Sequence, residues 1–191
     1  HRDEVYRASF QGQEYTLKWY HPPSATPEQR ARIGQLIKSG APNDRFLWPL
    51  DLAVCQGIPS FGYLMPLREE RFQGVAELMH RTLDPTFRTL TTVGLELADS
   101  FLRLHALGLC YTDISFATIS FDPDLGEISL GDSDNVVLDG KATGPVLGTL
   151  RFTAPEIIRG EAVPNTNTDL YSLGVILFYL LLSDHPLEGS R

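Results

Sequence analysis

TDLYSLGVILFYLL, residues 168–181, contains most of the longest apolar run of the chain, which extends from Leu173 to Leu182. A helix that spans a bilayer needs about 20 consecutive apolar residues, so this run is too short to cross a membrane. We therefore interpret it as a buried helix at the centre of the fold, and we expect no membrane partner.

Composition and charge narrow the class of protein. The chain has 191 residues, of which 42% are hydrophobic, and this suits one compact domain or two small lobes that share a cleft. The formal net charge is −8 and no basic run is present, so nucleic acid is a poor partner. Only Cys55 and Cys110 are present, and the first ten residues lack the apolar core of a signal peptide. We expect a cytoplasmic protein without a disulfide framework.

The first part of the chain is predicted to be mostly strand with one helix. VYRASF and EYTLKWY alternate in polarity around QGQ, which indicates a β-hairpin. Thr26, Pro27 and Gln29 are typical of a helix start, because they supply a cap, a proline at the first helical position and a capping-box glutamine. Gly40 is expected to end this helix. FLWPLDLAVC and SFGYLMPL are predicted to be two further strands.

From about Val75 the pattern becomes helical. PTFRTLTTVGLELADSFLRLHALGL contains a long amphipathic helix, and its apolar stripe, which includes Leu95 and Leu102, is predicted to face the core as far as Leu104. TISFD and EISLGD are expected to pair as a short hairpin. We place the boundary near residues 66–71, which gives domains at residues 1–68 and 69–191.

Three residues in this order are typical of phosphoryl transfer. Lys18 lies on the second strand of the first hairpin, Asp113 lies on the loop after the long helix, and Asp132 follows the short hairpin. The reaction needs a cation on the phosphates, a carboxylate that holds Mg²⁺ and a carboxylate that orients the attacking hydroxyl. The sequence therefore predicts a site for ATP and Mg²⁺.

The chain resembles the eukaryotic-type serine/threonine protein kinases over nearly its whole length. LHALGLCYTD looks like the end of a helix followed by the catalytic loop, and SLGDSD looks like the metal-binding strand and turn. GTLRFTAPE looks like the end of the activation segment, and TDLYSLGVILFYLL looks like the helix that anchors the large lobe. GT followed by APE, and then Asp169 with Ser172 and Gly174, is specific in combination. A bacterial kinase-like branch, with an Asp-Ile-Ser-Phe loop and an Asp-x-Asp-Asn turn, looks closer than the eukaryotic enzymes.

The resemblance implies an α+β, two-lobed fold, with a small β-rich N-lobe, a helical C-lobe and ATP between them. The helices that follow the central one in the family would be absent from this chain. It implies ATP and Mg as cofactors, and a protein substrate or a regulated partner protein. The resemblance assigns site residues as follows: Lys18 to the phosphates, Asp113 to catalysis, Asp132 to the metal, Thr118 to the position of the second metal ligand, and Met65 and Leu67 to the gatekeeper and hinge region that holds the nucleotide. It also implies that Thr149 is the activation-segment threonine, that Glu156 anchors that segment and that Asp169 holds catalytic-loop backbone.

Several positions depart from the family's pattern. Tyr111 and Thr112 precede Asp113 where the family has histidine and arginine, so control through a phosphorylated activation loop is not expected. Ser115 stands in place of a lysine, and Asp132 is followed by serine and aspartate rather than phenylalanine and glycine. Each change removes a charge or a packing group near the transferred phosphate.

The predicted small lobe departs too. No carboxylate lies in the middle of the helix over residues 27–39, where the family has a glutamate that pairs with the lysine. Gln35 fits by spacing, Arg32 or Gln29 by helical phase, and Glu28 is more simply a helix-dipole residue. Asp3 occupies the position of the last glycine of the glycine-rich loop, so this loop is altered or missing.

We therefore predict a kinase-like domain that binds ATP and Mg²⁺ and transfers phosphate weakly to protein hydroxyls. The alternative is a pseudokinase that acts as a binding or regulatory module. A third interpretation, a phosphotransferase for small molecules, is disfavoured by the segment from Gly148 to Glu156, which such enzymes generally lack.

Overall fold

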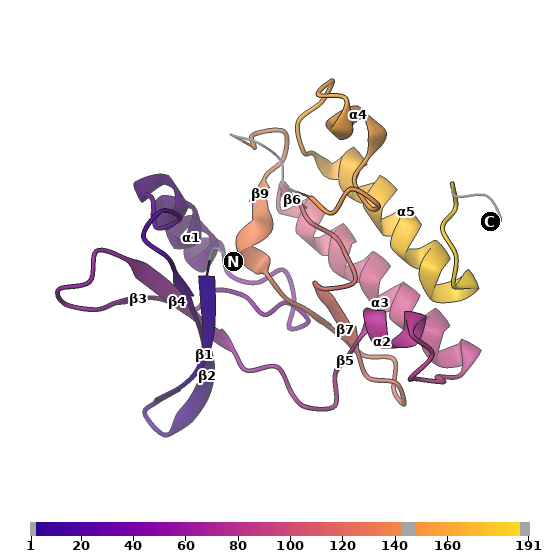
Figure 1. The fold of residues 1–191 in the computed structure, drawn as a ribbon, viewed down its shortest axis with the longest axis horizontal. Coiled ribbons are helices and arrows are strands. Elements are labelled where there is room, and N and C mark those ends of the chain that lie inside the picture. Colours follow the sequence, from indigo (N-terminus) through magenta and orange to yellow (C-terminus); the bar gives the residue numbers. More distant parts are fainter. Residues whose placement is uncertain (1–2, 143–147, 188–191) are drawn as a thin grey trace. The chain divides into compact units, whose positions relative to one another are not determined.

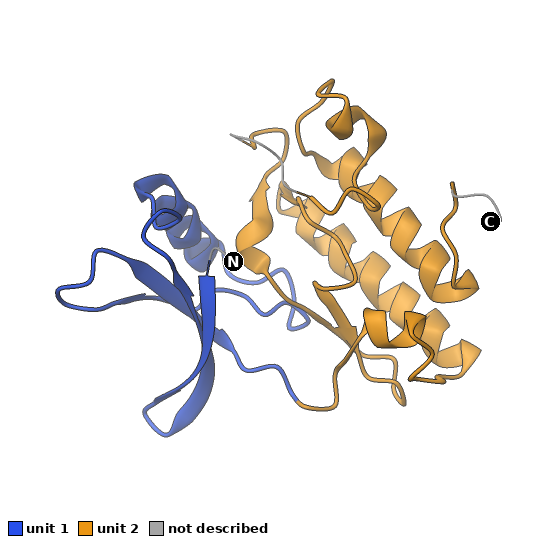
Figure 2. Ribbon diagram, in the orientation of Figure 1, with its two compact units in different colours: residues 1–69 blue, residues 70–191 orange. Residues whose placement is uncertain are grey.

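The computed structural model describes residues 3–142 and 148–187. The chain forms two compact units, residues 1–69 and residues 70–191, whereas the sequence places the domain boundary after residue 68 (Figure 2). Unit 1 contains four strands and a helix: β1 (Asp3–Phe10), β2 (Gln13–Tyr20), α1 (Pro27–Ser39), β3 (Asp51–Val54) and β4 (Phe61–Pro66) (Figure 1).

Unit 1 is a four-stranded antiparallel sheet in the order β1-β2-β4-β3. The β1–β2 hairpin turns at Gln11 and Gly12, whose φ values are both positive, at 52° and 78°. Two central residues with positive φ match the right-handed twist of the flanking strands and fix the register of a two-residue turn. Val5 therefore lies opposite Lys18, and Asp3 lies opposite Tyr20.

Helix α1 begins and ends where the sequence predicts. The Thr26 hydroxyl accepts a hydrogen bond from the backbone N–H of Gln29 at 3.2 Å, and the backbone N–H of Gly40 donates to the carbonyl of Leu36 at 3.2 Å. The capping-box role predicted for the Gln29 side chain is wrong, because its oxygen accepts from the Arg32 side chain, while its amide donates to the hydroxyl of Tyr20 at 2.9 Å. The helix start therefore depends on Thr26 and Pro27, and Gln29 joins the helix to strand β2.

The strand predicted over residues 46–55 is shorter than expected. It covers only Asp51–Val54, because Phe46 and Trp48 are buried anchors rather than strand residues. Their rings meet edge to face at 5.8 Å, and the indole N–H of Trp48 donates to the Leu36 carbonyl in the last turn of α1 at 2.8 Å. The Leu36 carbonyl also accepts from the Gly40 N–H, so the indole adds a second hydrogen bond that ties Trp48 to the end of α1.

Unit 2 is built on two long helices with short strands beside them. Helix α3 packs on α5, and both contact β6. The elements of unit 2 are β5 (Gln73–Gly74), α2 (Val75–Met79), α3 (Phe87–Ala106), β6 (Leu109–Tyr111), β7 (Ile119–Phe121), β8 (Ile128–Leu130), the 3₁₀ turn η1 (Ser133–Asn135), β9 (Val136–Leu138), α4 (Pro155–Ile158) and α5 (Thr166–Leu182). The predicted hairpin of TISFD and EISLGD is confirmed as β7 and β8.

The apolar stripe predicted for α3 is confirmed at Phe101 and Leu104, which are buried, and is wrong at Leu95 and Leu102. Leu95 and Leu102 are each 69% exposed, whereas Val93, Leu97 and Leu104 are fully buried. Residues separated by four, seven and eleven positions share one face of a helix, so Val93 fixes a face that leaves Leu95 well to one side. The core of unit 2 therefore contacts the face of α3 that carries Val93, Leu97 and Leu104.

Helix α5 is buried on one side only in the part of the chain that the structure describes. Leu173, Ile176 and Leu180 lie in the core, whereas Leu170 and Leu182 are exposed. The predicted buried helix is therefore confirmed for its α3-facing side. No helix among the described residues is both long and apolar enough to cross a membrane.

Candidate active site

Two loops of unit 2 lie between the same two pairs of strands. Residues 112–118 lead from β6 to β7, and residues 131–135 lead from β8 to β9. Because β6 pairs with β9 and β7 pairs with β8, both ends of each loop are held next to the ends of the other. Asp113 lies on the first of these loops and Asp132 on the second.

Hydrogen bonds link the two loops directly. The Tyr111 hydroxyl donates to the carbonyl of Gly131, and the Gly131 N–H donates to the carbonyl of Thr118 at 2.8 Å. The Thr112 hydroxyl and N–H both donate to the Asn135 carbonyl, at 2.9 and 3.3 Å. These hydrogen bonds therefore hold the loop that carries Asp113 against the loop that carries Asp132.

Tyr111 can donate the hydrogen bond that links the two loops because its hydroxyl stays protonated. Burial raises the pKa of its phenol well above the usual value, and the carboxylates of Asp132, Asp134 and Asp113 raise that pKa further. A neutral phenol donates one hydrogen bond, and here the Gly131 carbonyl accepts it. Sequence reasoning did not predict this contact.

Asp113 is fixed through one oxygen only. Its Oδ1 accepts hydrogen bonds from the Thr149 N–H at 3.1 Å and from the Thr149 hydroxyl at 3.2 Å. Within the described residues, no donor bonds to its Oδ2. Gly148 lets the chain approach closely here, because a Cβ at this position would lie 2.7 Å from the Thr153 hydroxyl. The arrangement orients the carboxylate and leaves one oxygen as an acceptor.

Asp132 lies at a sharp change of backbone direction. Its φ of 48° and ψ of 41° place it in the left-handed region, directly before the η1 turn. Aspartate tolerates this region better than most residues, because its short polar side chain bonds locally. The residue is half-buried at the end of β8, which suits a carboxylate that reaches a cation.

The oxygen donors of these loops fit Mg²⁺ better than a softer metal. Mg²⁺ is commonly held by one or two carboxylates together with substrate phosphates, rather than by a cage of protein ligands. Consistently, the described part of the chain has no group of three or more His, Cys, Asp or Glu side chains that could hold a metal ion.

Thr118 is committed to its own loop. It is 3% exposed, and its hydroxyl donates to the Ser115 carbonyl at 3.0 Å and accepts from the Ser115 N–H at 3.1 Å. A hydroxyl has two acceptor lone pairs, so a second acceptor position on Thr118 remains in principle. Its role at the metal stays a prediction, and its observed role is to shape the loop.

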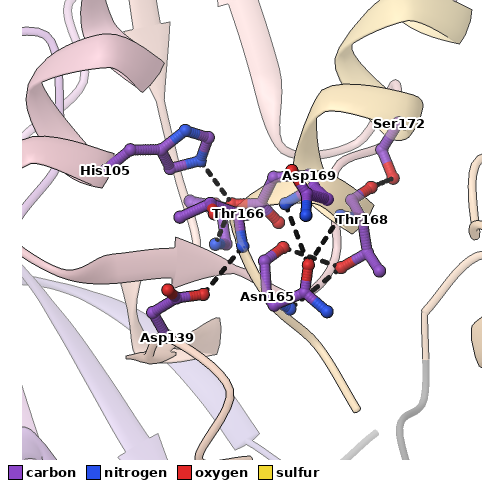
Figure 3. A network of polar contacts seen from close by, with 9 residues as sticks. His105, Asp139, Asn165, Thr166, Thr168, Asp169 and Ser172 are labelled. Carbon is purple, nitrogen blue, oxygen red and sulfur yellow. Dashed lines mark hydrogen bonds and ion pairs between the residues drawn. The ribbon is translucent and has the colours of Figure 1, made fainter. Parts of the chain in front are cut away.

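Asp169, in the first turn of α5, lies beside His105 of α3 (Figure 3). Its Oδ2 accepts from the Tyr111 N–H at 2.6 Å and lies 3.0 Å from Nε2 of His105, which confirms the prediction that Asp169 holds loop backbone. Burial raises the pKa of this carboxyl, while the hydrogen bonds from His105 and Tyr111 oppose the shift. Asn165 caps α5 by accepting from the N–H groups of residues 167 and 168, and Asp139 accepts from the Thr166 N–H at 2.9 Å.

In unit 1, Lys18 lies on the buried face of β2 with a side chain that is only 7% exposed. Its ammonium forms an ion pair with Oδ2 of Asp3 at 3.0 Å. Met65 is buried on β4 and Leu67, just after that strand, is half-buried. The Asp3 contact was missed in the sequence, although the two-residue turn at Gln11 and Gly12 would have given the register that predicts it.

Residues 71–191 match the family model for the protein kinase domain. The chain belongs to the eukaryotic-type serine/threonine protein kinase family.

Two relatives illustrate the range of similar proteins. Serine/threonine-protein kinase PknK of Mycobacterium tuberculosis is 33% identical over 164 residues, which cover 84% of this chain and 14% of PknK. Ribosomal protein S6 kinase alpha-4 of Mus musculus is 35% identical over 104 residues, which cover 51% of this chain and 13% of that protein. The kinase domain described here thus spans about one seventh of these relatives' length or less.

Two residues that depart from the kinase motifs, Thr112 and Ser115, form hydrogen bonds within unit 2. Where the family has arginine before the catalytic aspartate, Thr112 bonds the Asn135 carbonyl and carries no charge. Where it has lysine two residues after the aspartate, Ser115 is 4% exposed and accepts from the N–H of Ala117. Both replacements stabilise the loops of this kinase domain and supply no cation to a phosphate.

Proposed function

We propose that this kinase domain binds ATP with Mg²⁺ and transfers a phosphoryl group to hydroxyls of a protein substrate at a low rate. The main support is the carboxylate of Asp113, which is oriented through Oδ1 by Thr149 while, among the described residues, Oδ2 receives no hydrogen bond. A carboxylate held in this way can orient a substrate hydroxyl and accept its proton.

Each residue has a role that follows from its chemistry. Asp113 accepts the proton of the attacking hydroxyl, Lys18 donates to phosphate oxygens, and Asp132 binds the metal through a carboxylate oxygen. Bound Mg²⁺ supplies neutralisation of the charge on the phosphate oxygens. Met65 and Leu67 contact the nucleotide base, and Thr118 approaches the metal only through its second lone pair.

The low rate follows from charges that are missing. Ser115 provides no cation for the transferred phosphate, and the Thr118 hydroxyl is occupied by its own loop. Loss of one stabilising group in a transition state costs about 3–4 kcal/mol, and groups that act as a unit do not add. We expect turnover well below that of a kinase that has these groups.

The test measures phosphate transfer from radiolabelled ATP with Mg²⁺, using the full-length protein and casein as the acceptor. Asp113→Asn keeps the size and the acceptor oxygen for Thr149 but lowers basicity, so we expect incorporation to fall at least about a hundredfold. Asp124→Asn is the matched control, because it removes an exposed carboxylate of unit 2 outside the site, and its rate should equal that of the unsubstituted protein. Equal incorporation by both variants would exclude Asp113 as the base.

A regulatory module without catalysis is the second candidate function. The observation that favours it is that Ser115 and Thr118 form hydrogen bonds with each other within the loop. Neither side chain supplies the positive charge that the family's lysine brings to the phosphate. This candidate predicts saturable, Mg²⁺-dependent binding of ATP, measured by calorimetry, with no phosphate incorporation above that of Asp113→Asn. Incorporation that Asp113→Asn abolishes would exclude it.

A further inference from the structure

The buried ammonium of Lys18 needs a counter-charge. Thr16, Lys18 and Tyr20 alternate along β2 as buried residues, so the lysine side chain points to the side of the sheet that is covered. Removing an ammonium from water is unfavourable unless a carboxylate or other acceptors replace the lost hydration. The acceptors that replace this hydration help to decide where the ammonium lies.

Helix α1 is poorly equipped to supply a carboxylate. Its 13 residues contain one acid, Glu28, which is exposed in the first turn. On the following turn, Arg32 donates to the side-chain oxygen of Gln29, and the amide of Gln29 donates to Tyr20. None of the three polar candidates on this helix (Gln29, Arg32 and Gln35) carries negative charge.

Strand β1 supplies the acid instead. Asp3 lies opposite Tyr20 and Val5 lies opposite Lys18, so Asp3 and Lys18 are diagonal neighbours on one face of the hairpin. Their charged atoms are 3.0 Å apart, and Asp3 keeps 26% of its side chain exposed. The pair is fixed by the register of the tight turn, because a slip of one residue would move Asp3 to the other face.

We propose that Asp3 is the positioning residue for Lys18, holding the ammonium at the place where it meets nucleotide phosphates. This inference rests on the proposed function, because it assigns Lys18 to the phosphates of ATP. An ammonium has three N–H donors and can engage several acceptors at once, so pairing with a carboxylate is compatible with a bond to phosphate. Asp3 acts through Lys18 and does not touch the substrate.

The opposite role makes the opposite prediction. A carboxylate beside the phosphates could instead compete for the ammonium and repel the nucleotide, and its removal would then tighten binding. The sign of the effect on the affinity for ATP therefore separates a positioning residue from a competitor.

The experiment measures the dissociation constant of a fluorescent ATP analogue with Mg²⁺ for the full-length protein. Asp3→Asn should weaken binding about tenfold, which is the loss of one charge-assisted hydrogen bond. Asp3→Glu retains the charge and should restore most of the affinity. Glu4→Gln is the matched control, because Glu4 is the next residue of the same strand with its carboxylate on the other face, and it should leave the affinity unchanged. Unchanged or tighter binding by Asp3→Asn would overturn the proposal.

A second measurement needs no nucleotide. Acylation of Lys18 by an amine-reactive ester, followed by peptide mass spectrometry, should be faster in Asp3→Asn than in Glu4→Gln, because losing the carboxylate favours the neutral, nucleophilic amine. If the unsubstituted protein binds no nucleotide, the proposed function fails together with the positioning role, whatever the labelling shows. If it binds nucleotide and both affinity and labelling are insensitive to Asp3, the proposal for Asp3 fails alone.

Discussion

Asp169 of unit 2 and Lys18 of unit 1 are both buried charged side chains, and they are held in different ways. Asp169 of unit 2 is 2% exposed, and its carboxylate accepts from a backbone N–H and lies within hydrogen-bond distance of a histidine. Lys18 of unit 1 is 7% exposed and pairs with an aspartate on the edge strand β1 that still reaches water. The partners of Asp169 lie in the interior of its unit, whereas the partner of Lys18 lies on an edge strand and is partly exposed.

We propose that this difference separates a structural charge, Asp169, from a functional one, Lys18. Asp169 joins the start of α5 to the end of α3 and to the first residue before the catalytic loop, so three elements depend on it (Figure 3). Lys18 joins two adjacent strands that already share a ladder of hydrogen bonds. Removing Asp169 should therefore change folding, whereas removing Lys18 should change binding.

The largest expected effect comes from Asp169→Ala. The substitution leaves the Tyr111 N–H and the His105 ring without their acceptor in a buried place, and we expect a loss of about 3–5 kcal/mol in the free energy of unfolding. The measurement is chemical denaturation of the full-length protein, followed by circular dichroism.

Asp139→Ala is the matched control for this substitution. Asp139 also accepts from a backbone N–H, that of Thr166, but it is exposed, so water replaces the lost acceptor. We expect a loss of about 1 kcal/mol. Equal losses for the two variants would show that Asp169 is no more structural than a surface cap.

Asp122 is another buried carboxylate of unit 2, and its contribution to stability should depend on pH in the opposite direction to that of Asp169. Burial alone would raise the pKa of this carboxyl, but hydrogen bonds from the Leu125 N–H, the Arg71 side chain and the Asp124 N–H together lower it. A carboxyl whose pKa is lower in the folded state contributes stability that is present above its unfolded pKa, about 3.9, and is lost as the pH falls through its folded pKa. Asp169, whose pKa is raised, has the opposite sign.

Asp122→Asn should therefore flatten the acid side of the stability curve. We expect the unsubstituted protein to be more stable by about 1–2 kcal/mol at pH 7, and this difference to shrink as the pH falls below about 4. The measurement is denaturant unfolding at several pH values. Asp124→Asn is the control, because only its backbone N–H takes part in the turn. A difference that stays constant with pH would contradict the assignment.

Short-range signals predicted much of the fold. The Gln-Gly turn, the Thr26 cap and the two runs around DLGE lie within a few residues of the contacts they specify, so local chemistry was sufficient. On α3, Leu95 and Leu102 were wrongly assigned to the core, because they are as apolar as Phe101 and Leu104, which are buried. Only packing against α5 and β6 selects the face that carries Val93 and Leu97.

The candidate site shows the same division. Asp113 and Asp132 were predicted from their order along the chain and from the resemblance to protein kinases, and their catalytic and metal-binding roles stay predictions. The bond from Thr149 to Asp113 joins residues that are 36 positions apart, and the Tyr111 bond to Gly131 crosses 20 positions. The residue types do not predict these two hydrogen bonds, because threonine and tyrosine hydroxyls can donate to many different acceptors.

The smallest effect on stability is expected from Lys18→Met, and it tests the comparison most directly. Methionine has a similar length and no charge, so it removes the cost of burying an ammonium. The carboxylate of Asp3 that remains is 26% exposed and can be hydrated, unlike a carboxylate as deeply buried as Asp169. We expect the free energy of unfolding to stay within about 1 kcal/mol of the unsubstituted protein, while binding of ATP with Mg²⁺ is lost. Denaturant unfolding and calorimetry measure the two properties on one preparation. A destabilisation as large as that of Asp169→Ala would mean that Lys18 is a structural charge, and the distinction between the two buried groups would fail.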